Sequence, residues 1–238
     1  MTKNLIVSNS PTKGPEIFAS LQGEGLNIGS PTAFLRLAQC NLNCTWCDTR
    51  YTWDWENFDI HTETKRMPIV EVENAIDNLG MSRLVLTGGE PLIQQGSFIP
   101  LMFSLHDKGY SIEIETNGTI FPGSELLPII DCWNVSPKIS NSLVDSGLRF
   151  NESVLRKFVK LSNAYFKFVV QNRDDISEVK ELAEYLQIPI ERIFLMPEGE
   201  TTAKTNEINS WLAQACVNEG YRFTPRLHIL LWGDERGR

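Results

Sequence analysis

Short apolar runs alternate along the chain with longer stretches that carry apolar residues every three or four positions. Runs rich in branched and aromatic side chains are typical of buried strands, whereas the longer periodic stretches predict helices. The predicted strands are residues 32–37, 83–88, 111–115, 132–136, 165–170 and 192–196. The predicted helices are residues 69–79, 98–108, 152–161, 176–186 and 207–218.

Six strands that alternate with helices favour a parallel sheet whose strands are joined by right-handed crossovers. A closed barrel of eight such units would normally need more chain than these 238 residues provide. We therefore predict an α/β fold, a partial, open (β/α)6-type TIM barrel, in a single domain over residues 1–238. A polar and aromatic stretch at about residues 50–68 predicts a long insertion, and about residues 221–238 form a C-terminal extension.

The C-terminal extension contains the apolar run "RLHILLW", residues 226–232, which predicts a last strand. His228 within this run is a candidate for contact with a substrate, and the alternative is a histidine satisfied inside the core. The arginines Arg226, Arg236 and Arg238 are expected to be charges of the tail only.

The charge balance is acidic, because 22 lysines and arginines face 30 aspartates and glutamates, which gives a net charge of −8. A general nucleic-acid-binding protein would need a basic face, so this class is disfavoured. No apolar run approaches the about 20 residues of a membrane-spanning helix, and the N-terminus lacks the apolar stretch of a secretory signal. We expect a cytoplasmic protein that binds neither nucleic acid nor membrane directly.

Three of the five cysteines, Cys40, Cys44 and Cys47, lie within eight residues, on the loop that follows the first predicted strand. Three thiolates at such a position can hold one face of a 4Fe–4S cube and leave the fourth iron open for another ligand. The alternative is a zinc site with His61 as the fourth ligand. Cys132 and Cys216 lie in predicted buried elements and are expected to be small core residues.

Two further strand ends carry candidate ligand-binding residues. In "LVLTGGEP", residues 84–91, the glycines permit a close approach of the backbone to a ligand, and Glu90 can accept a hydrogen bond from an ammonium group. In "IEIETNGT", residues 112–119, the candidates that face a ribose or an amino acid are Glu115, Thr116 and Asn117. The alternative in both cases is an ordinary turn after a strand.

Four other residues are candidates for binding a polar substrate or a hard cation. Gln22 and Glu24 lie in the strip "FASLQGEG", residues 18–25, which offers hydrogen bonds to a planar ligand or forms a hairpin turn. Arg36 lies inside a predicted strand and needs an anionic partner, either a substrate carboxylate or a core acid. Thr49, two residues after the last clustered cysteine, supplies a hydroxyl that suits a hard cation such as Mg²⁺ or simply stabilises a turn.

The spacing Cys-x3-Cys-x2-Cys after the first strand, followed by "GGEP", resembles the signature of the radical S-adenosylmethionine (SAM) superfamily. This resemblance implies that the open iron of a 4Fe–4S cluster binds the methionine part of SAM. It also implies that reduction of the cluster cleaves SAM to a 5′-deoxyadenosyl radical. Within the superfamily, the combination of "LQGEG", "FLRL", "CDT", "TGGEP", "ETNGT" and "SPK" resembles the 7-carboxy-7-deazaguanine synthase family, most densely in residues 18–138.

The family resemblance implies a lyase that converts 6-carboxy-5,6,7,8-tetrahydropterin into 7-carboxy-7-deazaguanine with loss of ammonia, on the route to queuosine in tRNA and related deazapurines. The implied cofactors are a 4Fe–4S cluster, SAM and Mg²⁺. The implied partners are the small pterin substrate, an electron donor such as flavodoxin and a second copy of the chain in a homodimer.

The resemblance also implies the roles of individual residues, none of them catalytic beyond supporting the radical that SAM supplies. The cluster ligands are the three clustered cysteines, and Thr49 binds Mg²⁺. The substrate is bound by Leu21, Gln22, Gly23, Arg36, Thr87 and, as a further candidate, His228. SAM is bound by Gly89, Ser136, Pro137, Lys138 and Gln171, together with the candidates Glu90, Thr116 and Asn117.

Two alternative functions share some of these features. A glycyl-radical-enzyme activase uses the same cluster and SAM but acts on a glycine of a protein, and such activases often carry a second group of cysteines that this sequence lacks. A non-enzymatic zinc or iron–sulfur scaffold would need only the clustered cysteines.

Overall fold

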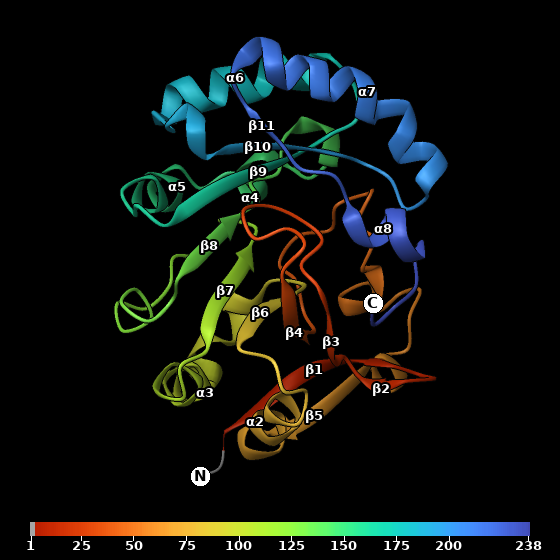
Figure 1. Cartoon of the computed structure of the whole chain (residues 1–238), viewed down its shortest axis with the longest axis vertical. Coiled ribbons are helices and arrows are strands. Elements are labelled where there is room, and N and C mark those ends of the chain that lie inside the picture. The colour runs from red at the N-terminus through yellow and green to blue at the C-terminus, as the bar shows by residue number, and fades with distance from the viewer. Residues whose placement is uncertain (1–2) are drawn as a thin grey trace.

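The computed structural model describes residues 3–238 and has at its centre one curved, unclosed sheet (Figure 1). The six predicted strands are confirmed, and all run parallel in the order in which they follow one another along the chain. They are β4 (Pro31–Leu37), β6 (Arg83–Gly88), β7 (Ser111–Thr116), β8 (Cys132–Val135), β9 (Ala164–Val170) and β10 (Ile193–Pro197). A two-residue strand, β11 (Arg222–Phe223), extends the parallel part beyond β10.

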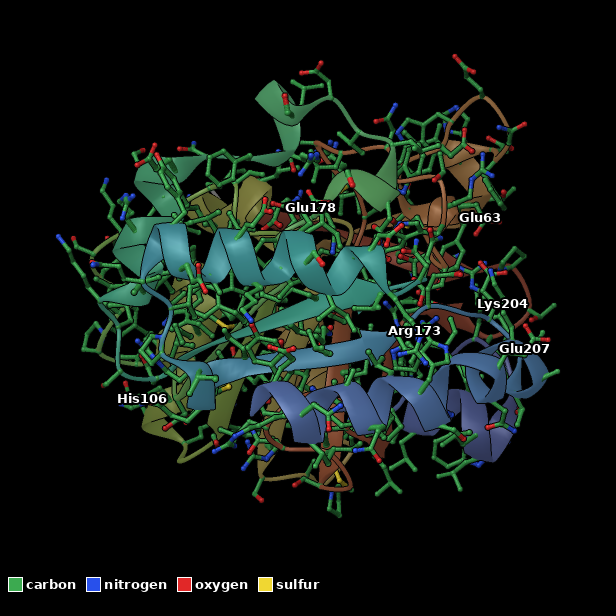
Figure 2. The ribbon with its side chains drawn as sticks, turned by 90° about the horizontal axis from the view of Figure 1, so that it is seen from above. Glu63, His106, Arg173, Glu178, Lys204 and Glu207 are labelled. Carbon is green, nitrogen blue, oxygen red and sulfur yellow. The ribbon has the colours of Figure 1, made fainter. Side chains whose placement is uncertain are left out.

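The five predicted helices are also confirmed, with ends that differ by a few residues, and they pack outside the sheet. They are α2 (Ile69–Asp77), α3 (Gln95–Asp107), α5 (Glu152–Val159), α6 (Asp174–Leu186) and α7 (Thr202–Glu219). Figure 2 shows α6 and α7 side by side, with Arg173 at the start of α6, and its guanidinium lies 5.1 Å from the ring centre of Trp211 on α7. The remaining helices are α1 (Ile60–Glu63), α4 (Ser146–Arg149), α8 (Leu227–Trp232), and the short 3-10 helices η1 (Arg50–Thr52), η2 (Pro91–Gln94), η3 (Ser140–Ser142) and η4 (Ile190–Arg192).

Four strands near the N-terminus were not predicted, and they extend the sheet beyond β4. They are β1 (Asn4–Ser10), β2 (Gly14–Pro15), β3 (Ile17–Leu21) and β5 (Thr64–Pro68). Strand β3 runs antiparallel to β4, and β5, which ends the insertion at residues 50–68, runs antiparallel to β1. The N-terminal part of the chain therefore covers one flank of the open barrel (Figure 1).

Alternation along the parallel strands separates the core from the barrel interior. In β7, Ile112 and Ile114 belong to the main apolar core, whereas Glu113 and Glu115 have the opposite orientation. In β9, Phe166 and Phe168 pack into the core on either side of Lys167. Because successive side chains of a strand point to opposite faces, the outward face packs against the helices and the inward face brings polar groups into the barrel.

The prediction of a strand over residues 226–232 was wrong, because this segment forms helix α8. The sheet ends at β11, and the chain then crosses the open side of the barrel, where Leu227 N donates to the Gly23 carbonyl at 2.9 Å. A seven-residue apolar run does not distinguish a strand from a short buried helix. Within residues 3–238, no helix is both long and apolar enough to cross a membrane.

Candidate active site

A cavity of about 210 Å³ opens at the carboxyl ends of the parallel strands, the edge at which open α/β folds bind ligands. Its wall joins the cysteine loop, the N-terminal strip, the strand ends and the C-terminal extension. Of the predicted site residues, it is lined by Leu21, Gln22, Gly23, Arg36, Cys40, Cys44, Cys47, Thr49, Thr87, Gly89, Thr116, Asn117, Ser136, Lys138 and His228. The structure does not bring Glu90, Pro137 or Gln171 to this wall.

The cysteine loop is fixed by backbone hydrogen bonds on both sides. Gln39 has a φ of +78° and donates its N–H to the Thr52 carbonyl at 2.7 Å, while its own carbonyl accepts from Glu90 N at 2.8 Å. Burial raises the pKa of the Cys40 thiol to about 12 and also raises the pKa of Cys44. A metal that binds these residues must displace their protons, and its positive charge compensates for the burial of the thiolates.

The arrangement of the three thiols fits an iron–sulfur cluster better than a single zinc ion. Within residues 3–238, no three His, Cys, Asp or Glu side chains lie close enough together to hold one metal ion. One zinc ion would draw thiolates to about 3.8 Å from one another, because Zn–S bonds are about 2.3 Å long. A 4Fe–4S cube offers a separate iron to each thiolate, so three sulfurs on one wall can bind it without meeting at one point.

Nearby groups surround the thiols with hydrogen-bond donors. Trp53 Nε1 donates to Cys47 Sγ at 3.3 Å, and Leu42 N donates to Cys40 Sγ at 3.4 Å. Hydrogen bonds to the ligand sulfurs are among the factors that set the reduction potential of a cluster. The Thr49 hydroxyl lies 3.6 Å from Cys47 Sγ, so a hydroxyl oxygen lies beside the last thiol of the cysteine loop.

Glu90 is fully buried and holds the "GGEP" turn to the end of β7. Its carboxylate accepts from Thr116 Oγ1 at 2.9 Å, Asn117 N at 2.7 Å and Leu92 N at 3.1 Å. These three donors explain why its side chain points away from the cavity. A Cβ atom at Gly89 would overlap the Gln39 carbonyl, so this glycine is needed for close packing against the cysteine loop.

Three residues after β8 were predicted to bind SAM, and two of them, Ser136 and Lys138, line the cavity wall. Lys138 Nζ donates to Ser136 Oγ at 2.8 Å and lies 5.4 Å from the ring centre of Trp46. Gln171 follows β9 but turns outward, because its N–H donates at 2.7 Å to Asp175 in the first turn of α6. Gln171 therefore lines a hollow on the outer surface rather than the cavity.

The N-terminal strip is held over the strands by two glutamates of β7. Gln22 Nε2 donates to Glu113 at 2.8 Å and to Glu115 at 3.3 Å. Glu115 also accepts from the Thr87 hydroxyl at 2.7 Å and lines the cavity, whereas Glu113 lies beneath it. Burial and the charge of Glu115 raise the pKa of Glu113. Glu113 was not predicted as a site residue, although it points to the same face of β7 as Glu115.

A buried ionic network that the sequence did not predict closes the far side. Lys167 of β9 pairs with Glu24, and the guanidinium of Arg226 lies 3.5 Å from Glu24 and also pairs with Asp48. Burial would raise the pKa of Glu24, but Lys167 and Arg226 hold that pKa well below its ordinary range. Since Arg226 is only 6% exposed, the prediction that it is a tail charge was wrong.

Arg36 and His228 complete the wall. Arg36 Nε lies 3.1 Å from Glu16 Oε2, so the core acid expected as one of its alternative partners is present, while the residue also faces the cavity. His228 reaches the cavity from α8, and burial lowers its pKa to about 4. A Cβ atom at Gly23 would lie 2.5 Å from His228 Nδ1, so the strip and α8 are in close contact.

Comparisons with known proteins agree with this geometry. Residues 36–131 match the model of the radical SAM superfamily. The chain is 42% identical to the 7-carboxy-7-deazaguanine synthase of Pyrobaculum aerophilum, over 94% of this chain and 96% of that protein, and 35% identical to that of Hyperthermus butylicus, over 94% of each. The crystal structure of QueE from Escherichia coli superposes with a TM-score of 0.70 at 24% identity, over 94% of this chain and 95% of that one.

Proposed function

Because the chain belongs to the 7-carboxy-7-deazaguanine synthase family of the radical SAM superfamily, we propose that the cavity holds its cofactors and a carboxylated tetrahydropterin side by side. The protein is a radical SAM lyase of deazapurine biosynthesis, and its cofactors are a 4Fe–4S cluster and SAM. The activase and scaffold alternatives are not favoured, since the curated relatives described above are all named as the synthase. We assign all of residues 1–238 to one radical SAM domain.

The cluster and SAM occupy the half of the cavity formed by the cysteine loop and the neighbouring strand ends. Cys40, Cys44 and Cys47 bind the cluster. The ends of β6, β7 and β8 bind SAM through residues on the same wall, namely Gly89, Thr116, Asn117, Ser136 and Lys138. When bound and reduced, these cofactors supply a radical that removes a hydrogen atom from carbon 6 of the pterin. Glu90 and Pro137 support the SAM site from behind the wall.

The pterin occupies the other half, between the N-terminal strip and α8. The Glu115 carboxylate and the Gln22 side chain face the cavity, and they offer acceptors and donors to the N–H and carbonyl groups of a planar pterin ring. Arg36 faces the same space and binds the 6-carboxylate through a charge-assisted pair. His228 is neutral at pH 7 because of its lowered pKa, so it can donate or accept a hydrogen bond without adding charge.

The observation that supports this proposal most strongly is the placement of three cysteines and Arg36 on one cavity wall. That wall puts a cluster site and a carboxylate-binding cation within reach of one small molecule. Thr49, next to Cys47, is the proposed ligand of a Mg²⁺ ion that orients the substrate. We further propose an electron donor of the flavodoxin type, a homodimer and a cytoplasmic location.

The test is to reconstitute the protein without oxygen and supply SAM, a reductant, Mg²⁺ and 6-carboxy-5,6,7,8-tetrahydropterin. We expect 7-carboxy-7-deazaguanine and ammonia, detected by mass spectrometry and an ammonia assay. Thr49→Ala is expected to lower turnover by about tenfold and to weaken its dependence on Mg²⁺, since a charge-assisted contact contributes about 1.5–3 kcal/mol. Cleavage of SAM without formation of the deazaguanine would contradict the proposed substrate, and unchanged Mg²⁺ dependence would contradict the role of Thr49.

A further inference from the structure

Arg236, near the end of the C-terminal extension, is held on three sides by the N-terminal half of the protein. Its guanidinium carbon lies 3.4 Å from the ring centre of Tyr51. Its Nε donates to Glu16 Oε1 at 3.1 Å, and its Nη1 donates to Glu63 Oε2 at 2.8 Å. Figure 1 shows the C-terminus beside the orange segment that contains the insertion, and Figure 2 labels Glu63 at that side. The prediction that Arg236 is a free tail charge was therefore wrong.

Glu16 connects Arg236 to the cavity. Its side chain is only 2% exposed, and its two oxygens have different partners. Oε1 faces Arg236 and accepts from the Tyr51 hydroxyl at 3.4 Å, whereas Oε2 lies 3.1 Å from Arg36 Nε. The Arg36 N–H also donates to the Glu16 carbonyl at 3.0 Å, so the two residues are fixed side by side where β3 meets β4. One buried carboxylate thus serves two guanidinium groups.

The partners of the two Glu16 oxygens determine which nitrogens of Arg36 remain available in the cavity. Arginine and carboxylate groups prefer a two-point pair in which two nitrogens meet two oxygens. Arg236 and Tyr51 occupy Oε1, and Oε2 meets Arg36 Nε as an ion pair, with no hydrogen bond between these two atoms. The terminal nitrogens of Arg36 donate no hydrogen bond to any residue within 3–238, and they then remain for a ligand in the cavity.

We propose that Arg236 is a positioning residue for substrate recognition. By engaging Glu16, it keeps Arg36 from forming a two-point pair with that glutamate and leaves the guanidinium directed toward the substrate carboxylate. This inference rests on the proposed function of the cavity and extends it, because it gives the C-terminal extension a part in specificity for a carboxylated pterin. Without Arg236, Glu16 Oε1 keeps only the Tyr51 hydroxyl at 3.4 Å, so it can join Oε2 in a two-point pair that draws Arg36 away from the substrate.

The test compares Arg236→Ala and Arg236→Lys with the reconstituted wild-type protein. For Arg236→Ala we expect the KM for the carboxylated pterin to rise by about tenfold, as for the loss of one well-aligned charged contact, with kcat little changed. Arg236→Lys keeps the charge beside Glu16 and is expected to recover part of the loss. If the alanine variant fails to fold, as judged by thermal unfolding, the lysine variant still tests the proposal.

Arg156→Ala is the matched control. Arg156 also pairs with a carboxylate, Glu152 at 2.7 Å, and also lies over an aromatic ring, that of Tyr185 at 4.9 Å, but it is on α5 and does not line the cavity. Its removal is expected to leave the KM unchanged. A rise in KM equal to that of Arg236→Ala would overturn the proposal, because the effect would then not depend on Glu16.

Two further measurements separate positioning from general damage. In an Arg36→Ala background, Arg236→Ala is expected to add no further rise in KM, whereas additive losses would contradict the proposal. Direct binding of a tetrahydropterin that lacks the 6-carboxylate is expected to be equal in wild type and Arg236→Ala, and equal weakening of both pterins would also contradict it. If the wild type binds both pterins but yields no deazaguanine, the proposed function is contradicted. The binding of the two pterins by the wild type and by Arg236→Ala then still tests whether Arg236 positions Arg36.

Discussion

At the scale of single residues, His228 shows how the cavity sets a protonation state. Burial lowers the pKa of its imidazole from 6.5 to about 4. The neighbouring cations Arg226 and Arg36 act in the same direction, while Glu24 and Glu115 act against it. The neutral form that results can approach a substrate without a second positive charge beside Arg36.

The lowered pKa of His228 predicts that the folded protein loses stability in acid. Between pH 6.5 and about pH 4, His228 binds a proton in the unfolded chain but not in the folded protein. The free energy of unfolding therefore falls as the pH falls. The loss is about 3 kcal/mol over this window, at about 1.4 kcal/mol per unit of pKa. Denaturant unfolding at pH 7.5 and pH 4.5 measures it, and His228→Gln is expected to reduce the difference between the two.

His106→Gln controls for the removal of a histidine, since His106 is exposed on α3 and lies across the molecule from Glu63 in Figure 2. A His228→Gln variant that loses as much stability in acid as the wild type would show that other groups cause the loss.

The sequence indicated candidate site residues that depend on local spacing, and it carried no sign of contacts between residues that are distant along the chain. The cysteine spacing and the glycines of "GGEP" lie on continuous segments, so their pattern alone indicates their place. Glu16, Lys167 and Asp48 each join a partner far away in the chain, at Arg36, Glu24 and Arg226 respectively. Which acid meets which base is decided by tertiary packing, for which a single sequence carries no local signal.

At the scale of elements, burial explains which strands were predictable. The outward face of the parallel strands packs in the core and is rich in branched and aromatic side chains, so these strands were recognisable although their inward face carries polar groups. The N-terminal strands β1 and β3 mix polar and apolar residues and were missed, while α8 was taken for a strand because its run is short. Strand β9 interrupts its apolar run with one charged residue, because Lys167 lies between the core residues Phe166 and Phe168.

Lys167 of β9 is expected to be important for stability because it neutralises a buried acid. Lys167→Met leaves Glu24 with one cation fewer, and loss of one partner of a buried pair costs about 3 kcal/mol or more. Denaturant unfolding of the single variant and of Glu24→Gln/Lys167→Met measures this, and the double variant is expected to recover much of the stability. Lys180→Met is the control, since the Lys180–Glu219 pair has side chains that are 52% and 36% exposed and contributes at most about 1 kcal/mol. Equal effects of the two lysine variants would contradict the prediction.

At the scale of the whole molecule, the proposed cluster site and the main core are separate. The main core extends from Leu5 of β1 to Cys216 of α7 and includes the outward faces of the parallel strands. The cysteine loop has its own small apolar cluster, which comprises Leu42, Cys44 and Val144. Hydrogen bonds also join the cysteine loop to the loop at residues 139–145 that contains Val144. For example, Trp46 Nε1 donates to the Asn141 carbonyl at 3.1 Å. The barrel therefore does not depend on the iron for its core.

This separation predicts that removal of iron loosens one region without unfolding the protein. Unlike a zinc finger, which is unfolded without its metal, the chelated enzyme is expected to keep its helical circular dichroism and a cooperative unfolding transition. Its melting temperature is expected to fall by a few degrees, since a ligand that binds only the folded state stabilises that state. Hydrogen exchange measured by mass spectrometry is expected to accelerate in residues 40–49 and 139–145, where the loops meet, and to stay slow in β7. Loss of protection throughout the sheet would contradict this prediction, because it would show that the cluster holds the barrel together.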